Sequence, residues 1–278
     1  MVLNGTLMNT RNTIILTVNN KEKTIIGILK GLTSTLSADT VRIIVILDGC
    51  TDTTKEIVEL FISKSSDRFK FDVISTDDIW ETKANNIGLM MVNTPYATLV
   101  QDDMLLKEKS WDRKLLNIFL KYNVFAVTGR TAHNFSLIDG QFNPVNLVGR
   151  EYPLGSDNII GKLIAKLMVL FKPYWIYKFI TPVDMRLTVN RGPLVLNMLK
   201  ARKLNFFDEQ FAPFELDDVD LCCRAFKQYG LYSAACPVYY LEIGGSKVNS
   251  SKSSEVSRYS IEKNTKILIE RHSNLAVT

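Results

Sequence analysis

Hydrophobic positions in the first half of the chain fall into short β-branched runs separated by amphipathic stretches. The runs lie at 13–18, 42–47, 71–76, 96–101 and 124–129. Runs of this length that alternate with helical periodicity are typical of β-α-β units around a mostly parallel sheet. The pattern therefore predicts an α/β fold in which helices fill the gaps between the strands.

The clearest predicted helix begins directly after the second run. Thr53 and Glu56 have the spacing of a capping box. The apolar residues that follow at helical spacing are Ile57, Val58, Phe61 and Ile62. We expect this helix to start beside the carboxyl end of the strand at 42–47.

Regular patterning returns in the last third of the chain. It predicts helices near 193–202, 217–229 and 255–270 and a strand pair around 231–241. The Ser- and Lys-rich stretch 246–254 is typical of a flexible loop.

Between these two parts, the stretch 159–180 is strongly apolar but is interrupted by Pro173 and by four lysines at Lys162, Lys166, Lys172 and Lys178. A membrane span needs about 20 apolar residues without such interruptions. An amphipathic helix on a membrane surface, a helix in a homodimer interface, and a hydrophobic helix packed on its own domain all remain compatible with the pattern.

Composition narrows the class of protein. A chain of 278 residues with 46% hydrophobic residues can bury the core of one domain. The balance of 34 basic and 29 acidic residues, +5 in all, is far below that of nucleic-acid-binding proteins. It suits a phosphate-bearing ligand or an anionic membrane surface. Four cysteines without metal or disulfide spacing, and an N-terminal apolar run without a cleavage site, predict a cytoplasmic protein.

Acidic residues follow two of the predicted strands. Asp48 ends the run at 42–47, and Asp102 and Asp103 end the run at 96–101. In an open α/β sheet the carboxyl ends of the strands border the ligand crevice. Asp48 can accept a hydrogen bond from a base or a sugar, or it can cap the next helix. Adjacent carboxylates favour a divalent cation, although an acidic turn would explain them too.

A third acidic cluster lies near the predicted helix at 217–229. Its members are Asp208, Glu209, Glu215, Asp217, Asp218 and Asp220. The helix dipole stabilises carboxylates at a helix start, which accounts for two or three of them. A partly buried carboxylate with a raised pKa can also act as a general base near neutral pH.

The order of these segments resembles that of family 2 glycosyltransferases, which are inverting enzymes of the GT-A fold. The resemblance runs from about Asn12 to Ser246. It is carried by TIILTVNNKEKTI, VILDGCTDTT for the family's DDGSTD element, KANNIGLMMVNTPYATLVQDDM, NRGPLVL, FDEQF, and LDDVDLCCRAFKQYG for the family's EDVDL segment. Each motif is loose alone, and it is their shared order and spacing that indicate the family.

The resemblance implies a GT-A, Rossmann-like fold with a mixed, mostly parallel sheet flanked by helices. It implies a domain at 1–246, with a nucleotide-sugar-binding half at 1–130 and an acceptor-binding half at 131–246 that contains the apolar insertion, followed by a loop and helix at 247–278. It further implies sugar transfer from a nucleotide-sugar donor, UDP-linked, to a saccharide or lipid-linked saccharide acceptor in surface polysaccharide biosynthesis. The expected cofactor is Mn²⁺ or Mg²⁺, and the expected place is the cytoplasm at the inner face of the membrane.

Residue by residue, the resemblance assigns donor-binding roles on the first half of the chain. Thr17 and Asn19 correspond to the turn that holds the base, and Asp48 to the acid that bonds it. Asp102 corresponds to a residue near the ribose or the metal's water ligands. Further donor contacts, to the diphosphate or to the Asp loop, are expected from Lys83 and Asn86.

The remaining assignments concern the metal and the chemistry. Asp103 corresponds to the direct metal ligand, and Asp218 to the general base, with Asp217 in place of the family's usual Glu. Glu242 stands near the position where many relatives have a metal-binding His. Two departures leave alternatives open, since Asn19 replaces a base-stacking aromatic residue and Gln101 replaces the first acid of the DxD element.

Two other classes of protein compete with this interpretation. A sugar nucleotidyltransferase would need a glycine-rich basic loop after the first strand, and VNNKEKT contains no glycine. A non-catalytic carbohydrate- or nucleotide-sugar-binding protein on the same fold is the other alternative. The partners that we expect are a nucleotide-sugar donor and a saccharide or lipid-linked acceptor, with no nucleic acid.

Overall fold

The computed structural model describes residues 10–65, 68–129, 134–138, 141–145, 183–243, 251–273 and 275. The apolar stretch 159–180 lies outside these residues. No helix in the described part of the chain has the length and apolar character needed to cross a membrane.

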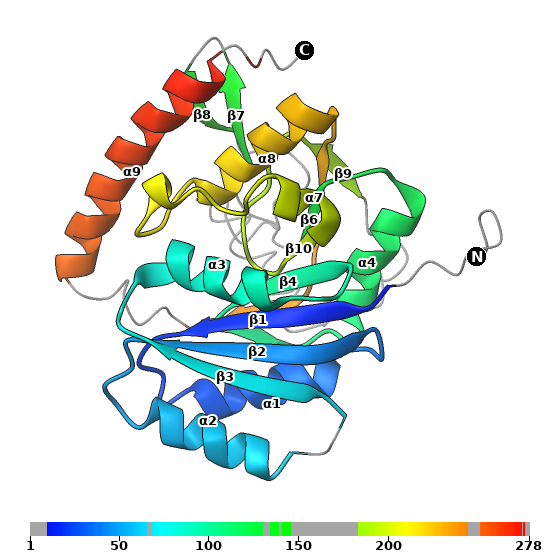
Figure 1. Ribbon diagram of the computed structural model, residues 1–278, viewed down its shortest axis with the longest axis vertical. Coiled ribbons are helices and arrows are strands. Elements are labelled where there is room, and N and C mark those ends of the chain that lie inside the picture. The colour runs from blue at the N-terminus through cyan, green and yellow to red at the C-terminus, as the bar shows by residue number, and fades with distance from the viewer. Residues whose placement is uncertain are drawn as a thin grey trace, which may run out of the picture.

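A central sheet of eight strands forms the body of the molecule, in the order β3-β2-β1-β4-β10-β6-β11-β9 (Figure 1). The strands at its donor half are β1 (Asn12–Val18), β2 (Thr40–Asp48), β3 (Lys70–Thr76) and β4 (Tyr96–Gln101), all parallel. The others are β6 (Ala126–Thr128), β9 (Asp184–Arg186), β10 (Leu194–Asn197) and β11 (Ser233–Ala235). Because β10 and β9 run against their neighbours, the sheet is mixed but mostly parallel, as the sequence predicted.

Helices cover both faces of this sheet, because side chains of a strand alternate between its faces. Ile14 and Leu16 of β1 pack on one side, against the helices α1 (Ile25–Thr35), α2 (Thr54–Ser63) and α4 (Trp111–Lys121). Ile15 packs on the other side, with α3 (Trp80–Met91), α7 (Met198–Lys203) and α8 (Asp217–Tyr229). Two apolar layers therefore hold the strands in place.

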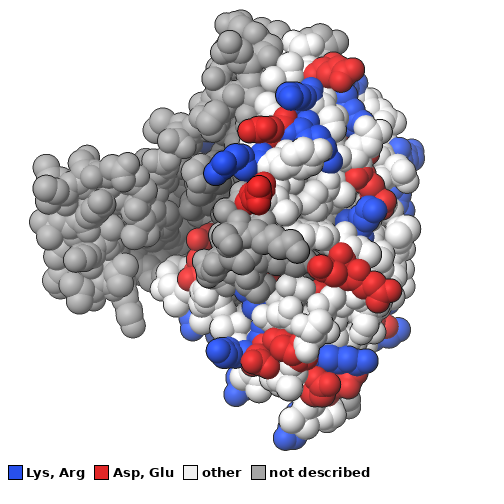
Figure 2. Space-filling model, turned by 90° about the vertical axis from the view of Figure 1, so that its left-hand side faces the viewer, with Lys and Arg blue, Asp and Glu red and all other residues white. Residues whose placement is uncertain are grey.

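Smaller elements complete the structure. β5 (Met104–Leu106) pairs with β12 (Tyr240–Glu242), and β7 (Asn134–Ile138) pairs with β8 (Gln141–Val145). A short 3-10 helix, η2, spans Glu209–Phe211. The long α9 (Ser251–His272) runs along the outside of the molecule, next to α8 in the view of Figure 1. On the face shown in Figure 2, described acidic and basic residues are interspersed.

Most predicted elements are confirmed within a few residues, and the departures have local causes. Residues 194–197 form a strand rather than the start of a helix, because they are buried between β4 and β6. The two strands predicted around 231–241 exist, but they pair with β6, β9 and β5 instead of with each other. Part of the predicted flexible loop at 246–254 is helical, since α9 begins at Ser251.

The predicted capping box is also wrong, although α2 begins where expected. The side chain of Thr53 makes no capping hydrogen bond. Its hydroxyl instead donates to Glu22 Oε2 at 3.0 Å. Asp52 takes over the capping role, because its Oδ1 accepts from the backbone N–H of Thr54 at 3.1 Å.

Candidate active site

The carboxyl ends of β1, β2 and β4 meet at one edge of the sheet. Thr17 lies opposite Gln101 on one side and opposite Ile46 on the other. The loops that follow these strands therefore start side by side, and they carry most of the residues that the sequence assigns to the donor.

Asp48 is buried at the tip of β2, with 1% of its surface exposed. Its Oδ1 accepts from Thr76 Oγ1 at 2.9 Å and from the backbone N–H of Ile79 at 2.7 Å, and its Oδ2 accepts from the N–H of Trp80 at 3.0 Å. The carboxylate thus holds the connection between β3 and α3. Gly49 next to it has φ +61, and a Cβ there would lie 2.5 Å from Asp78 Cβ, so the connection passes too close for a side chain.

Asn19 joins the tip of β2 to the acidic loop after β4. Its backbone N–H donates to Asp102 Oδ2 at 2.9 Å, and its Nδ2 donates to the carbonyl of Asp48 at 2.6 Å. Lys21 Nζ lies 3.6 Å from Asp102 Oδ1. Burial raises the pKa of Asp102 to about 6, even though Lys21 and the Asn19 N–H lower it. The turn after β1, which is expected to hold the nucleotide base, is therefore connected to the acidic loop after β4.

The other donor-side residues lie on or against α3. Thr17 Oγ1 donates to Asn85 Oδ1 at 2.9 Å. Asn86 is buried and exchanges two hydrogen bonds with the backbone of Phe207, at 2.9 and 3.1 Å. Its amide thereby ties α3 to the FDEQF segment, whereas Lys83 is exposed on the same helix. Contacts of these residues with a diphosphate stay a prediction.

Arg191 is the centre of a buried charge network that the sequence did not point to. It binds Asp217 in a bidentate manner, with Nη1 to Oδ2 at 2.8 Å and Nη2 to Oδ1 at 2.7 Å. Its Nε lies 3.4 Å from Glu81 Oε1, which also accepts from Gln101 Nε2 at 3.2 Å. Burial alone would lower the pKa of Arg191, but the charges of Asp217 and Glu81 outweigh it and raise that pKa.

The network links the residue that replaces the first DxD acid, Gln101, to the start of α8. No local signal in the sequence marks Glu81 or Arg191, because each is one charged residue among many. Arg191 is the second residue of the NRGPLVL motif, and its place in that motif is the one hint that the sequence offers.

Asp218 lies in the first turn of α8 and is 7% exposed. Its Oδ2 accepts from the backbone N–H of Arg191 at 2.8 Å, and its Oδ1 accepts from the N–H of Val219 at 2.9 Å. Burial, with the neighbouring charge of Asp217, raises the pKa of Asp218 to about 6 against the opposing charge of Arg191. A carboxylate with that pKa is ionised at neutral pH and basic enough to take a proton.

Glu215 is a further acid beside Asp218, two residues before α8. Burial and the charge of Asp218 raise its pKa to about 7. Its backbone is left-handed, with φ 78, and so is that of Leu216, with φ 65. Non-glycine residues rarely adopt this conformation, so surrounding contacts must hold it.

Of the two predicted metal ligands, Asp103 lies in the turn just before β5, and Glu242 is the last residue of β12, which pairs with β5. The backbone N–H of Ile243 donates to the carbonyl of Asp103 at 2.8 Å, and Glu242 lies opposite Met104 in the β5–β12 pair. Within the described ranges no three His, Cys, Asp or Glu residues are grouped to hold a metal ion. Carboxylate oxygens nevertheless suit Mg²⁺ or Mn²⁺, which commonly bind through one or two carboxylates and fill their other positions with phosphate and water oxygens.

Hydrogen bonds, one ion pair and the peptide link between Gln101 and Asp102 connect the three parts of the site. Asp48 reaches the acidic loop through Asn19 and Asp102, and the same loop reaches Asp218 through Gln101, Glu81 and Arg191. The donor-side acids and the start of α8 thus belong to one continuous polar network at the carboxyl edge of the sheet.

Solved structures of similar fold are glycosyltransferases. TarS 1-349 from S. aureus has a TM-score of 0.55 at 15% identity, and the match covers 91% of this chain and 65% of that one. The same protein in complex with UDP gives a TM-score of 0.53 at 14% identity, over 91% of this chain and 65% of that one. This chain therefore spans somewhat less than two thirds of the length of the TarS chain.

A second structure of this kind is the mannosyltransferase PcManGT from Pyrobaculum calidifontis in complex with GDP-Man and Mn²⁺. Its TM-score is 0.63 at 12% identity, and the match covers 96% of this chain and 70% of that one. The similarity of these structures to this chain, at 12 to 15% sequence identity, shows that they share the GT-A fold.

Sequence comparison gives the family. No curated protein matches the sequence. The profile described as glycosyl transferase family 2 matches residues 13–179, which is more than half of the chain. With the fold and the arrangement of acidic residues described above, this match shows that the chain belongs to glycosyl transferase family 2.

Proposed function

We propose that this protein is an inverting glycosyltransferase that uses a nucleotide sugar, UDP-linked, as donor. The observation that carries the proposal is the environment of Asp218. Its carboxylate is oriented by two backbone N–H groups, has a pKa of about 6, and is joined through Arg191, Glu81 and Gln101 to the acidic loop after β4. A general base and a donor-side acidic loop in one network are what a single displacement requires.

In the proposed reaction Asp218 takes the proton from an acceptor hydroxyl. As that proton leaves, the acceptor oxygen forms a bond to the anomeric carbon of the donor sugar, and the bond from this carbon to the diphosphate oxygen breaks. Attack from the face opposite the leaving group inverts the configuration at the anomeric carbon. The backbone N–H of Arg191 orients Asp218, and the guanidinium of Arg191 offsets the charge of Asp217.

Donor recognition is assigned to the loops at the ends of β1, β2 and β4. In this proposal Thr17, Asn19 and Asp48 shape the base-binding turn, and Asp102 lies near the ribose. Asp103, with Glu242, would hold a divalent cation that stabilises the charge of the departing diphosphate. The complexes of the similar structures with UDP and with GDP-Man and Mn²⁺ support a nucleotide ligand and a cation.

The acceptor in this proposal is a saccharide or lipid-linked saccharide of surface polysaccharide biosynthesis. Peripheral membrane contact through residues 159–180 would bring the enzyme to such an acceptor at the inner face of the membrane. Flotation with anionic vesicles tests that contact, and a protein that stays unbound would contradict it.

Calorimetry with nucleotides tests the donor site. We expect UDP or a UDP-sugar to bind in the presence of Mn²⁺, and binding to weaken at least tenfold in an Asp103→Ala variant, because the cation would lose its main ligand. Glu59→Ala, which removes an exposed acid on α2, is the matched control and should bind like the wild type. Equal nucleotide affinities with and without Mn²⁺, in the control as well as in Asp103→Ala, would argue against the metal site. If GDP binds and UDP does not, the donor is a guanine nucleotide instead of a uridine nucleotide.

A further inference from the structure

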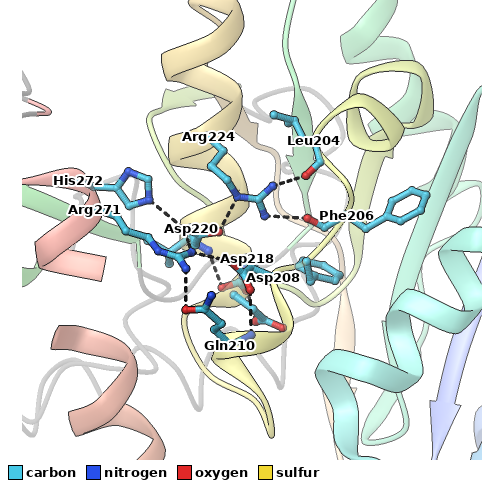
Figure 3. A network of polar contacts seen from close by, with 12 residues as sticks. Leu204, Phe206, Asp208, Gln210, Asp218, Asp220, Arg224, Arg271 and His272 are labelled. Carbon is cyan, nitrogen blue, oxygen red and sulfur yellow. Dashed lines mark hydrogen bonds and ion pairs between the residues drawn. The ribbon is translucent and has the colours of Figure 1, made fainter. Parts of the chain in front are cut away.

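The C-terminal helix α9 contacts the segment that leads into Asp218. Figure 3 shows Arg271 and His272, at the end of α9, pointing toward Asp220 of α8. Asp220 is fully buried and accepts from His272 Nε2 at 2.9 Å and from Arg224 Nε at 2.6 Å. Although burial acts to raise it, the pKa of Asp220 is lowered by these hydrogen bonds and charges. The first turn of α8 is thereby anchored to α9.

Further contacts of α9 reach the loop before α8. Arg271 donates to Asp208 Oδ2 at 2.7 Å and to Gln210 Oε1 at 2.9 Å. Lys263 Nζ donates to the carbonyl of Ala212 at 2.8 Å. The segment 208–216, which we call the base loop, is thus bound to α9 at its beginning and in its middle.

Asn264 makes the densest of these contacts. Its side chain is fully buried, and its Nδ2 lies 2.8 Å from the carbonyl of Phe211, 3.0 Å from that of Phe214 and 2.8 Å from that of Glu215. An amide group has two hydrogens, so three carbonyl groups converge on one donor. The base loop is curved around this single side chain.

The opposite side of the base loop faces the active site. The carbonyl of Pro213 accepts from the N–H of Thr82 at 3.1 Å, and the ring of Phe214 stacks on Trp80 with the centroids 5.6 Å apart. The loop ends in the left-handed Glu215 and Leu216. Because a left-handed conformation costs free energy in these residues, the carbonyl contacts with Asn264 help to maintain it.

We propose that α9 positions the acceptor side of the active site, and that Asn264 is the residue that holds the base loop so that Glu215 and Asp218 face the acceptor. This inference rests on the proposed transferase function. Asn264 does not touch the reacting atoms and is therefore a positioning residue. It acts on Asp218 through the backbone of the loop that precedes α8.

The test compares three variants on α9. Asn264→Asp keeps the shape of the side chain but replaces the donor NH₂ with an oxygen. Lys263→Met removes one peripheral contact with the same loop and is the milder variant, for the case that the first folds poorly. Tyr259→Ala removes a side chain that is 67% exposed on the same helix and serves as the control.

Hydrogen exchange and kinetics are measured on all three. In Asn264→Asp we expect at least tenfold faster exchange in peptides covering 208–217, with β1 and β2 unchanged. We expect kcat for transfer to fall by about 10²-fold, the usual effect of a misplaced catalytic group, with the donor dissociation constant within about twofold of wild type. Lys263→Met should shift both readouts in the same direction by less, and Tyr259→Ala should match wild type.

A pH profile separates positioning from a purely structural role. If the base loop moves, Asp218 loses part of the burial that raises its pKa, and the acid limb of the transfer rate moves to lower pH. Unchanged exchange in 208–217, or faster exchange with wild-type kcat and acid limb, would overturn the inference. A wild-type chain that binds no nucleotide sugar would refute the proposed function instead, and the exchange data would still decide whether Asn264 holds the loop.

Discussion

The acidity of Asp218 gives a quantitative prediction for the pH dependence of transfer. A free Asp has a pKa of about 3.9, whereas burial raises the pKa of Asp218 to about 6. The base works only when deprotonated, so the rate is highest above the pKa and falls as the pH drops through it. With a pKa of about 6, the ionised fraction is about 90% at pH 7 and about 10% at pH 5.

The perturbation is a change of pH from 8 to 4.5 at saturating donor, with kcat measured by release of the nucleoside diphosphate. We expect an acid limb of unit slope with a midpoint near 6, about two pH units above that of an exposed Asp. Asp218→Asn should lower kcat by about 10²- to 10⁴-fold at pH 7.5, the usual contribution of a general base, and leave donor binding intact.

Glu215 provides the internal control for this reasoning. Its pKa is raised to about 7, so Glu215 is mostly protonated, and therefore neutral, at the midpoint expected for Asp218. A Glu215→Gln variant carries a neutral side chain at every pH, so the acid limb should stay near pH 6 while activity persists. If Asp218→Asn transfers sugar at the wild-type rate, or if only Glu215→Gln abolishes transfer, Asp218 is not the base.

Three further predictions concern the surrounding network. Arg191→Met leaves the fully buried Asp217 without its bidentate partner and should destabilise the fold by about 3–5 kcal/mol in urea denaturation. A double variant with Asp217→Asn should recover part of that loss. If the losses of the two single variants simply add up in the double variant, the two residues are not coupled. Asp48→Ala removes an acceptor of three hydrogen bonds and should cost about 3 kcal/mol by the same assay; a loss below about 0.5 kcal/mol would show that the connection after β3 does not depend on it. Chelation with EDTA should abolish transfer, and added Mn²⁺ should restore it in wild type but not in Asp103→Ala; undiminished transfer in EDTA would exclude the cation.

The donor-side strands were predictable because their signal is local. Each β-branched run at 13–18, 42–47, 71–76 and 96–101 became a strand within two residues of its predicted ends. The helix at Asp217–Tyr229 was predicted with the correct bounds, since its apolar face and its acidic first turn are both visible in the sequence.

The short segment Leu194–Asn197 shows where this reasoning stops. Four residues of an apolar run fit a strand and the start of a helix equally well. Pairing with β4 on one side and β6 on the other decided the outcome, and both partners are far away in the chain. The pairing of β12 with β5, which brings Glu242 near the Asp103 loop, could not be predicted from the sequence pattern either.

Local periodicity and the order of the motifs were enough to predict the α/β architecture, the family and the acidic residues at the strand ends. The folded arrangement was needed to show that Arg191 and Glu81 connect the acidic loop to Asp218, and that the Asp48 carboxylate binds the connection between β3 and α3. It was also needed to show that three carbonyl groups of the base loop converge on Asn264. The physical reason is that burial and hydrogen bonding join side chains far apart along the chain, and neither leaves a trace in the spacing of neighbouring residues.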